Sequence, residues 1–268
     1  MTTFKFNTVN LETLGNITVV DGYLDMPEKR GSNIVIPFQH GTSYANKYYD
    51  ERTIQFGIAV IETTSAALET QFETIRALFS TMEPKTLEVT MEDASVRTVL
   101  ASCEKPLQVK RMSNKNARII VELTLHRPFF RSDTLYTVDS DAIDGTPDPT
   151  ELDVVNSGGI EERDPKLILY GPLENPVITN TTPTPDVILT YTGVIDDGET
   201  VTIETATTGE FTAHYSKGAG SNVIGNVTHS GSSALMVFEV GTNAVTIADD
   251  NYDGGNAKLT VAFYTPYL

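Results

Sequence analysis

Residues 52–92 read RTIQFGIAVIETTSAALETQFETIRALFSTMEPKTLEVTME, and the period of their apolar residues changes twice. The runs at 52–62 and 85–92 are rich in β-branched residues and partly alternate, which is typical of strands. Between them, apolar residues recur at spacings of four and three, which places them on one face of a helix. The members of this stripe are Leu68, Phe72, Ile75, Phe79 and Met82. The stretch therefore predicts a helix between two strands.

The predicted helix has signals at both ends. Thr64 or Ser65 can cap its first turn, and Pro84 stops it. The apolar stripe has two interpretations: a face that binds a partner, or a face that packs on the domain's own sheet. We expect the second, because it is the commoner arrangement for an amphipathic helix beside strands.

The rest of the first half contains further strand patterns. Residues 33–38, 95–104 and 117–126 are β-branched and partly alternating. We therefore expect a mainly β protein whose N-terminal domain, residues 1–132, is β-sandwich-like and carries one helix.

The second half has the pattern of short strands and turns only. Gly, Asn and Asp separate the strands at regular spacing, which indicates a sandwich or a jelly roll, and no helical period or internal repeat is present. The predicted strands are 166–170, 175–179, 186–193, 199–205, 210–215, 221–225, 234–240, 243–248 and 257–264. Residues 133–149 are rich in Asp and Pro, so we expect a linker or a long connecting loop there. The second domain then covers residues 150–268.

The net charge of −17 is divided unequally between the halves. Residues 1–134 hold 15 Lys or Arg and 16 Asp or Glu, whereas residues 135–268 hold 4 and 20. This difference supports a division into two domains. An acidic surface repels phosphate, so we do not expect the second half to bind nucleic acid directly.

Cysteine content and hydropathy indicate the compartment. Cys103 is the single cysteine, which excludes an internal disulfide and any CxxC zinc or redox site and favours a reducing cytoplasm, at least during assembly. The N-terminal residues lack a basic flank and a long apolar run, so no signal peptide is expected, and no 18-residue apolar stretch predicts a membrane span. We interpret the N-x-T sequons at Asn16, Asn180 and Asn226 as chance matches in a Thr-rich chain.

Asp196, Asp197 and Glu199 surround Gly198 just before an alternating run. This cluster is either a set of catalytic or metal-binding carboxylates or a tight turn that enters a strand. Catalysis would need a second carboxylate at a defined separation and a pKa raised by burial, and no apolar residues surround these acids in sequence. Asp-Gly is a favoured turn dipeptide because both residues tolerate positive φ. We expect a turn.

Asp249, Asn251, Asp253 and Gly254 match the start of an EF-hand calcium loop. The twelfth position is Thr260, where an EF-hand requires a bidentate Glu, and strands rather than helices are predicted on both sides. We expect a solvated hairpin loop. A weak calcium loop between strands stays open as the alternative.

Other patterns typical of catalytic or ligand sites are incomplete. None of the four histidines is at ligand spacing from another: His40, His126, His214 and His229. Residues 218–223 (GAGSNV) lack the third glycine of a dinucleotide fingerprint, and Cys103 has no His nearby in sequence. No G-x-S-x-G motif or P-loop occurs. We therefore expect a protein that is not an enzyme, with no catalytic residue, no metal site and no cofactor.

The order of several segments along nearly the whole chain is similar to the order in a known protein family. In the first half these are FNTVNLETLG (6–15), IPFQHGTSY (36–44), ERTIQFGIAV (51–60), KTLEVTMEDASVRTVLASCEKP (85–106) and ARIIVELTLHRPFFRS (117–132). In the second half they are DPKLILYGPLENPVITNTT (164–182), DVILTYTGVIDDGETVTIET (186–205) and GTNAVTIA (241–248). This order resembles the siphophage distal tail (Dit) proteins, and the second half is similar to the galectin-like domain of that family.

The resemblance implies an assembly and its partners. Residues 1–132 would be a tail-hub domain that forms a hexameric ring at the tip of the tail tube, with a pore that DNA crosses without specific binding. Residues 150–268 would be a galectin-like jelly-roll β-sandwich that anchors baseplate or receptor-binding proteins. The implied partners are the other copies of a homo-hexamer, the tail tube protein, and a tail hub or tail-lysin protein, with no membrane. The protein would be assembled in the host cytoplasm and become part of the virion at the tail tip.

Two other classes of protein stay open. Galectin-like sandwiches often bind sugars, so one alternative is a carbohydrate-binding β-sandwich protein, in which Tyr would supply the aromatic platform because Trp is absent. The other is a secreted or phage-borne glycosidase, for which no carboxylate pair can be nominated.

Overall fold

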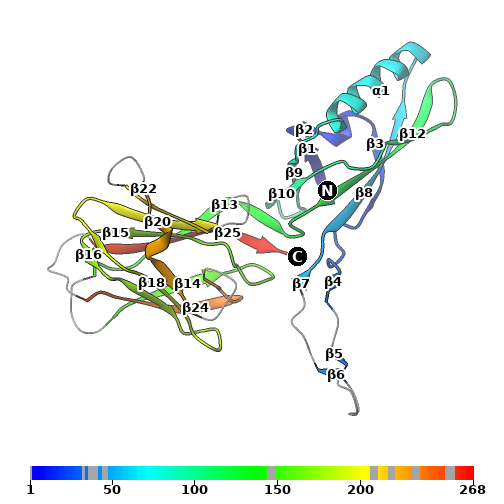
Figure 1. The fold of residues 1–268 in the computed structure, drawn as a ribbon. Coiled ribbons are helices and arrows are strands. Elements are labelled where there is room, and N and C mark those ends of the chain that lie inside the picture. The colour runs from blue at the N-terminus through cyan, green and yellow to red at the C-terminus, as the bar shows by residue number, and fades with distance from the viewer. Residues whose placement is uncertain are drawn as a thin grey trace. The chain divides into compact units, whose positions relative to one another are not determined.

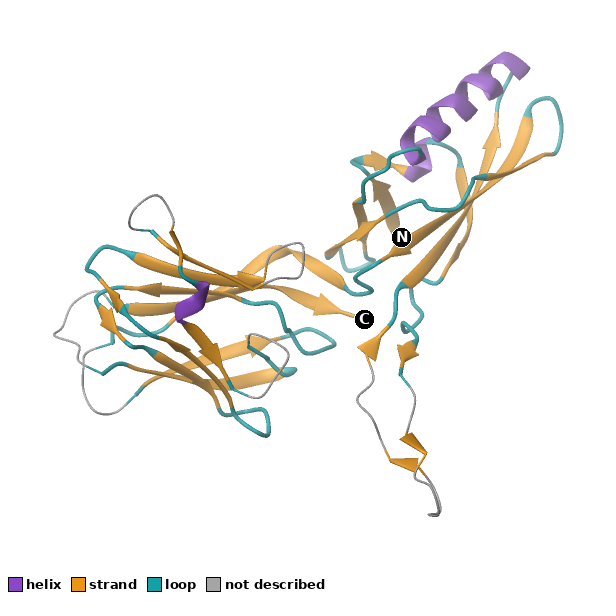
Figure 2. Ribbon diagram, viewed as in Figure 1, coloured by secondary structure: helices purple, strands orange, loops and turns teal. Residues whose placement is uncertain are grey.

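The computed structural model describes residues 2–31, 34–35, 42–43, 48–143, 149–205, 211–216, 221–230, 236–250 and 257–268. Within these ranges the chain is mainly β, with antiparallel strands and one α-helix, α1 (Ser65–Phe79), as the sequence predicts (Figures 1 and 2). The chain divides into two compact units: Met1–Asp133 with Leu268, here unit 1, and Thr134–Tyr267, here unit 2. No helix of the described residues is long and apolar enough to cross a membrane.

Unit 1 contains two antiparallel sheets. The first has the strand order β2-β1-β9-β10-β13 and consists of β1 (Thr3–Phe6), β2 (Val9–Asn10), β9 (Lys85–Thr90), β10 (Val96–Ala101) and the first residues of β13 (Phe130–Asp139). The second has the order β11-β12-β8-β3 and consists of β3 (Asn16–Asp21), β8 (Arg52–Ile61), β11 (Gln108–Arg111) and β12 (Asn116–Leu125). A short helix, η1 (Leu11–Thr13), precedes β3. Two short ladders lie between β3 and β8 in the chain: β4 (Lys29–Arg30) with β7 (Tyr48–Tyr49), and β5 (Ile34–Val35) with β6 (Thr42–Ser43).

Aromatic side chains join the layers of unit 1. Phe4 of β1 and Phe56 of β8 meet edge to face with ring centroids 5.2 Å apart, so the two sheets share one core. Phe79 at the end of α1 stacks on Phe6 of β1 at 5.1 Å, which brings the helix into the same core. Unit 1 is therefore sandwich-like, with one helix packed on it.

Helix α1 begins where the sequence predicts and ends earlier. The hydroxyl of Thr64 accepts the N–H of Ala67 at 3.1 Å, which makes Thr64 the cap. Four members of the predicted stripe are buried, whereas Met82 is 99% exposed. The inclusion of Met82 was wrong because the helix stops at Phe79, before the turn on which Met82 would have joined the stripe. Pro84 therefore lies beyond a helix that has already ended.

Unit 2 has two antiparallel sheets that enclose one core. The first has the order β13-β25-β15-β20-β21-β22 and contains the later residues of β13, β15 (Lys166–Tyr170), β20 (Thr200–Thr205), β21 (Phe211–Tyr215), β22 (Ser221–Asn222) and β25 (Lys258–Tyr267). The second has the order β14-β24-β17-β18-β23 and contains β14 (Thr150–Asn156), β17 (Val177–Asn180), β18 (Val187–Tyr191), β23 (Val227–His229) and β24 (Gly241–Ala248). A separate pair, β16 (Leu173–Glu174) and β19 (Val194–Ile195), and a short helix, η2 (Ile224–Asn226), complete the described elements. Figures 1 and 2 show the two layers.

The stretch 133–149, for which the sequence predicts a linker, contributes to unit 2. Residues 134–139 continue strand β13, and Ile143 is buried in the core of this unit. The hydroxyl of Tyr136 accepts the N–H of Val155 at 3.0 Å. Ile143 and the partly buried Tyr136 and Val138 of this stretch are therefore part of the sandwich.

Of the apolar run at 234–240 the structure describes residues 236–240, of which the first three are buried, and they form no regular strand. Only Phe238 pairs, in an isolated bridge with Glu162. The strand predicted here was wrong because buried side-chain amides replace a neighbouring strand as partners of the backbone. Asn180 donates to the Val237 carbonyl at 2.6 Å, and Asn156 donates to the Phe238 carbonyl at 3.1 Å.

Asn243 completes this group of buried asparagines, which also includes Asn156 and Asn180. Its amide nitrogen donates to the Glu239 carbonyl at 2.8 Å, and its amide oxygen accepts the Glu239 N–H at 2.8 Å. All three asparagines have 0% exposure. Asn180 therefore serves as an internal hydrogen-bonding group, and its sequon is not accessible in the folded protein.

Candidate functional site

The acidic cluster at 196–199 is a turn between β19 and β20. The N–H of Glu199 donates to the Asp196 carbonyl at 3.0 Å, and Gly198 has a φ of +77°. A turn of this kind needs positive φ at its third residue, which glycine adopts without strain. The Glu199 carboxylate accepts a hydrogen bond from Ser216 at the end of β21, so one of the three acids is engaged by a neighbouring strand. The turn predicted from Asp-Gly is confirmed.

This turn packs against the GPLENP segment at 171–176. The N–H of Gly171 donates to the Glu199 carbonyl at 2.9 Å. A Cβ atom at Gly171 would lie 2.2 Å from the Asp196 carbonyl oxygen, so only glycine allows this approach. Two segments that carry the family resemblance therefore meet in the fold, and their residues serve the packing of unit 2.

Asp249, the first residue of the EF-hand-like motif, is a structural acceptor. Its Oδ1 accepts the N–H of Glu174 at 2.6 Å, while its Oδ2 is buried without a hydrogen-bond partner among the described residues. Burial raises the pKa of Asp249. Thr260, at the position of the missing Glu, lies in β25 and donates to Asp139 at 2.5 Å. Asn251, Asp253 and Gly254 lie outside the described residues.

Strands, as the sequence predicts, lie on both sides of this motif: β24 ends before it and β25 follows it. Among the residues that the structure describes, no group of three or more His, Cys, Asp or Glu could hold a metal ion. Residues 218–220 of the GAGSNV segment and His40 also lie outside the described part.

The fold brings together four residues that the sequence did not connect. Ser102 Oγ lies 3.1 Å from His126 Nε2, which is also 3.0 Å from a carboxylate oxygen of Glu104. The other ring nitrogen, Nδ1, is 3.8 Å from Glu51. These residues meet because the bridge of Ser102 with Thr124 sets the loop after β10 beside the end of β12. No sequence spacing signals this contact.

The geometry of this group does not fit nucleophilic catalysis. Ser102 Oγ also lies 3.1 Å from Glu104, which accepts its hydrogen, so the carboxylate competes with the imidazole for the hydroxyl. The 3.8 Å separation of Glu51 and Nδ1 is too long for the hydrogen bond that orients a catalytic histidine. The group is a half-exposed cluster of polar side chains on unit 1.

Cys103 lies in an open groove between the end of α1 and the loop after β10. The groove has a volume of about 440 Å³ and is lined by Arg76, Phe79, Ser80, Cys103, Glu104, Lys105, Pro106 and Leu107. Burial raises the pKa of the Cys103 thiol, and the Glu122 carboxylate raises it further. The thiol is therefore protonated at neutral pH and is a weak nucleophile.

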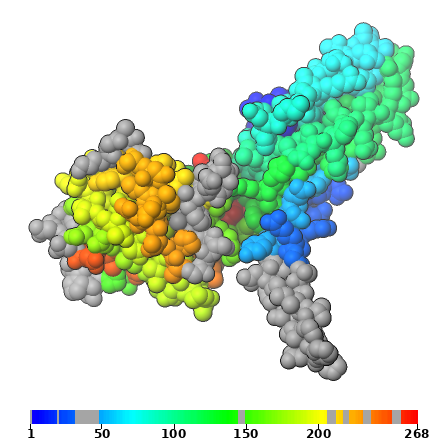
Figure 3. Space-filling view, in the orientation of Figure 1, coloured from blue at the N-terminus to red at the C-terminus, as the bar shows by residue number. Residues whose placement is uncertain are grey.

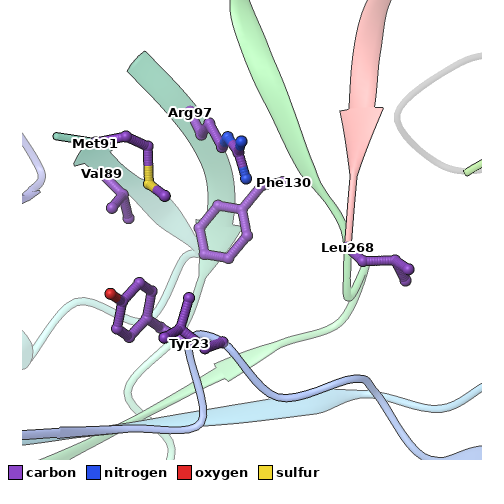
Figure 4. Close-up of a pocket in the computed structure, with 7 residues that line it drawn as sticks. Tyr23, Val89, Met91, Arg97, Phe130 and Leu268 are labelled. Atoms are coloured by element: carbon purple, nitrogen blue, oxygen red, sulfur yellow. The ribbon is translucent and has the colours of Figure 1, made fainter. Parts of the chain in front are cut away.

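A second, smaller pocket lies in unit 1 around the ring of Phe130 (Figure 4). Its lining residues are Tyr23, Leu24, Val89, Met91, Arg97, Phe130 and Leu268. The volume of about 20 Å³ holds roughly one water molecule, far below the ~300 Å³ of a small-molecule site. This pocket is a packing defect beside the core.

Comparison with known proteins gives a family domain and a fold. Residues 5–125 match the family model of the phage tail protein RIFT-related domain. The SPP1 Dit (gp 19.1) protein, described as a paradigm of the hub adsorption apparatus in phages that infect Gram-positive bacteria, matches with a TM-score of 0.70 and 10% identity over 100% of both chains. Chains of the phage P2 baseplate in its activated conformation, with Ca and with Sr, match at TM-scores of 0.43 and 0.45, with 12% and 11% identity over 98% of both chains. A search of the curated proteins found no match.

These findings confirm the resemblance to siphophage distal tail proteins. Residues 5–125, nearly all of unit 1, form a phage tail protein RIFT-related domain. The whole chain has the fold of the SPP1 Dit protein. The matched family domain and the matched fold are both those of phage tail or adsorption proteins.

Proposed function

We propose that this protein forms a hexameric ring at the tip of the tail tube and anchors peripheral baseplate or receptor-binding proteins. The observation that carries this proposal is the succession of a phage tail domain at 5–125 and a second β unit with its own core, in the order of the SPP1 Dit fold. Unit 1 would build the ring, and DNA would cross its pore without specific binding. A ring suits the end of a tube because each copy presents the same surfaces to its neighbours.

Electron microscopy of tail tips from the phage that encodes this chain tests the ring. Averaged images of tips labelled with an antibody to the full-length protein should show six copies in one ring. A three-fold or asymmetric placement would contradict the hexamer. Full-length protein in dilute solution is not a substitute, because a ring of this kind can require the tail tube to close.

The two units should divide the work of attachment. Fragments are best divided between Asp133 and Thr134, because residues 134–143 contribute strand β13 and Ile143 to unit 2. We expect residues 1–133 to bind isolated tail tubes, and residues 134–268 to bind a peripheral baseplate protein or the tail hub or tail-lysin protein. Capture of tail tubes by the second fragment alone would contradict this division.

The same proposal makes the protein a structural component without catalytic activity of its own. Its acids at 196–199 form a turn packed on Gly171, and no other arrangement among the described residues suits catalysis. Turnover of peptidoglycan or an oligosaccharide that is lost in Asp196→Asn, Asp197→Asn or Glu199→Gln would contradict it. A glycan array tests the carbohydrate-binding alternative with the same full-length protein.

A further inference from the structure

Strand β14 is the outermost strand of the five-stranded sheet of unit 2. In the order β14-β24-β17-β18-β23, all seven of its residues pair with β24 on one side, from Thr150 opposite Ile247 to Asn156 opposite Gly241. No described strand pairs with its other side. An edge strand of this length leaves a row of backbone N–H and C=O groups open to a further strand.

The strands at the far edges of the two sheets of unit 2 are much shorter. Strand β22 has two residues and β23 has three, and a short edge strand is one of the ways in which proteins prevent unwanted pairing. The residues of η2 and β23 reach the surface of this unit, where they are orange in Figure 3. Strand β14 differs from both short strands, because it keeps seven regular residues at an open edge.

One side chain identifies the backbone groups of β14 that point away from β24. The N–H of Val155 donates to the Tyr136 hydroxyl at 3.0 Å, so residue 155 belongs to the outward-pointing set. In an antiparallel ladder this set contains every second residue. The N–H and C=O groups of Glu151 and Asp153 therefore also point outward, and they form no hydrogen bond with another described residue.

The side chains of the same two residues are acidic. Glu151 and Asp153 are exposed on the outer face of the sheet, because the alternate residues Leu152 and Val154 point into the core. Neither carboxylate forms an ion pair with a described residue, and the residues opposite them in β24 carry no charge. Two copies of β14 that paired with each other would bring these acids together. The edge is therefore protected against a second copy but not against a basic strand.

Apolar side chains lie beside the inner face of the same edge. Tyr136 and Val138 of β13 are partly buried and pack against the core of unit 2. Tyr136 reaches β14 through its hydroxyl, so its ring lies at the rim of the core next to this edge. The residues of an added strand alternate between the two faces, so one set would contact this rim and the other would lie beside the acids. The edge therefore fits a strand in which apolar and basic residues alternate.

The charge of the whole unit favours the same partner. Residues 135–268 hold 4 Lys or Arg and 20 Asp or Glu, so the electrostatic field around unit 2 attracts cationic segments before contact. Facing charges of opposite sign also stabilise a pair of strands once it has formed. Charge thus contributes to both the encounter and the bound state, whereas backbone hydrogen bonds fix the added segment as a strand.

We propose that the outer edge of β14 binds an extended segment of a partner protein in which basic and apolar residues alternate. The segment adds to the five-stranded sheet as a further strand. Its basic side chains lie beside Glu151 and Asp153, and its apolar side chains cover Tyr136 and Val138. This inference deepens the anchoring role proposed above, and it rests on that proposal only for the place of the partner in the baseplate.

Peptide binding to the ¹⁵N-labelled full-length protein tests this edge. The probe is a seven-residue peptide of alternating Lys and Val, the length of β14, and the control has the same composition with its Lys and Val in two blocks. At saturation, hydrogen exchange of the Glu151 and Asp153 amides should slow by about 10-fold or more with the alternating peptide only, because these N–H groups gain partners. The amides of Leu152 and Val154 already face β24 and should not change.

Three results of this experiment overturn the proposal. Equal slowing with both peptides would show that charge alone attracts them. Slowing confined to other amides would place the peptide elsewhere. Slow exchange at Glu151 and Asp153 that needs no peptide and disappears on dilution would make a second copy the occupant of the edge.

Charge reversal at the edge gives a second readout, in which a restored interaction shows that the variant is folded. Glu151→Lys with Asp153→Lys should bind the Lys–Val peptide about 10-fold or more weakly, and should bind a peptide of alternating Glu and Val instead. Asp186→Lys with Asp197→Lys changes two exposed acids of unit 2 outside this edge and is the matched control for net charge. It should weaken binding of the Lys–Val peptide less than about 3-fold. Equal losses in the two double variants overturn the proposal.

The fragment test of the anchoring role separates this inference from the proposed function. Peptide binding at β14, combined with no capture of a peripheral baseplate protein by residues 134–268, would contradict the anchoring role alone. Capture of such a protein with no change in exchange at Glu151 and Asp153 would contradict this inference alone.

Discussion

The two units satisfy their buried backbone groups with different side chains. In unit 1 the guanidinium of Arg52, 4% exposed, donates from Nε to the Gly22 carbonyl at 2.7 Å and from Nη2 to the Tyr23 carbonyl, and lies over the ring of Phe130. Burial lowers the pKa of Arg52, and the nearby Asp25 carboxylate opposes this shift. In unit 2 the neutral amides of the three buried asparagines donate hydrogen bonds to backbone carbonyls instead.

The difference follows from the hydrogen-bonding groups of the side chain that each unit uses. A guanidinium only donates hydrogen bonds, so it can satisfy two backbone carbonyls that lack another donor. An amide both donates and accepts, so it can satisfy the carbonyl and the N–H of one residue. Asn243 does this for Glu239. A buried amide also avoids the cost of desolvating a charge. Both cores depend on single polar side chains, so one substitution can destabilise either unit separately.

The largest effect should come from Asn243→Ala in unit 2. The change removes both hydrogen bonds that Asn243 makes with the backbone of Glu239 and opens a cavity at a fully buried position, and we expect the free energy of unfolding of unit 2 to fall by about 4 kcal/mol. Calorimetry of the full-length protein should show this in the transition of unit 2 only. Asn222→Ala, which removes one exposed hydrogen bond, is the control and should cost less than about 1 kcal/mol. An equal shift of both transitions would contradict the independence of the two cores.

Arg52→Met is the corresponding change in unit 1. It removes both hydrogen bonds to the carbonyls of Gly22 and Tyr23 but keeps an apolar stem beside Phe130, and we expect a loss of about 3 kcal/mol from unit 1. Arg52→Lys keeps the charge but lacks the planar guanidinium that donates to both carbonyls. Its free energy of unfolding should therefore lie between those of Arg52→Met and the wild type. The measurement is urea unfolding followed by tyrosine fluorescence. An unchanged midpoint for Arg52→Met would show that the buried cation does not stabilise the unit.

Two glycines of unit 2 allow the loss of stability from a steric clash to be compared with the loss from an unfavourable φ. Gly171→Ala forces a Cβ against the backbone at Asp196, so we expect a loss of about 3 kcal/mol. Gly198→Ala meets no atom within 4 Å but retains a φ of +77°, so it should cost only about 1 kcal/mol. Thermal unfolding of both variants gives the ranking. A larger loss for Gly198→Ala would contradict the close approach of the two segments.

The smallest expected effect is the pH dependence contributed by Asp139. Its hydrogen bonds with Lys258 and Thr260 hold the pKa of Asp139 below its ordinary range, and the same carboxylate raises the pKa of Lys258. A lowered acid pKa stabilises the fold above the ordinary value near pH 4, and this contribution disappears as the pH falls through the lowered pKa. Because the pair is exposed, we expect Asp139→Asn to cost about 0.5 kcal/mol at pH 7.

The Asp139→Asn difference is measured by urea unfolding at several pH values. It should be constant between about pH 5 and pH 9 and vanish below about pH 3. It should also shrink in about 1 M salt, which screens exposed charges. A difference that grows as the pH falls would contradict the assignment.

Elements with a local cause can be predicted from the sequence without the fold. The strand at 166–170 has the bounds that its alternation predicts, and Thr64 caps α1 where its hydroxyl can accept an N–H three residues on. The turn at 196–199 forms because glycine at position 198 supplies the positive φ. Periodicity, capping and turn conformation act over a few residues, so they can be read without knowing the partners.

Contacts between segments far apart in the chain become visible only in the folded protein. Residues 236–240 have the apolar composition of a strand, yet buried asparagines from three other segments fix them in an irregular path. Ser102 and His126 come together only through the bridge between Ser102 and Thr124. Strand pairing is set by the sum of many contacts between residues far apart in the chain, and no local period encodes it.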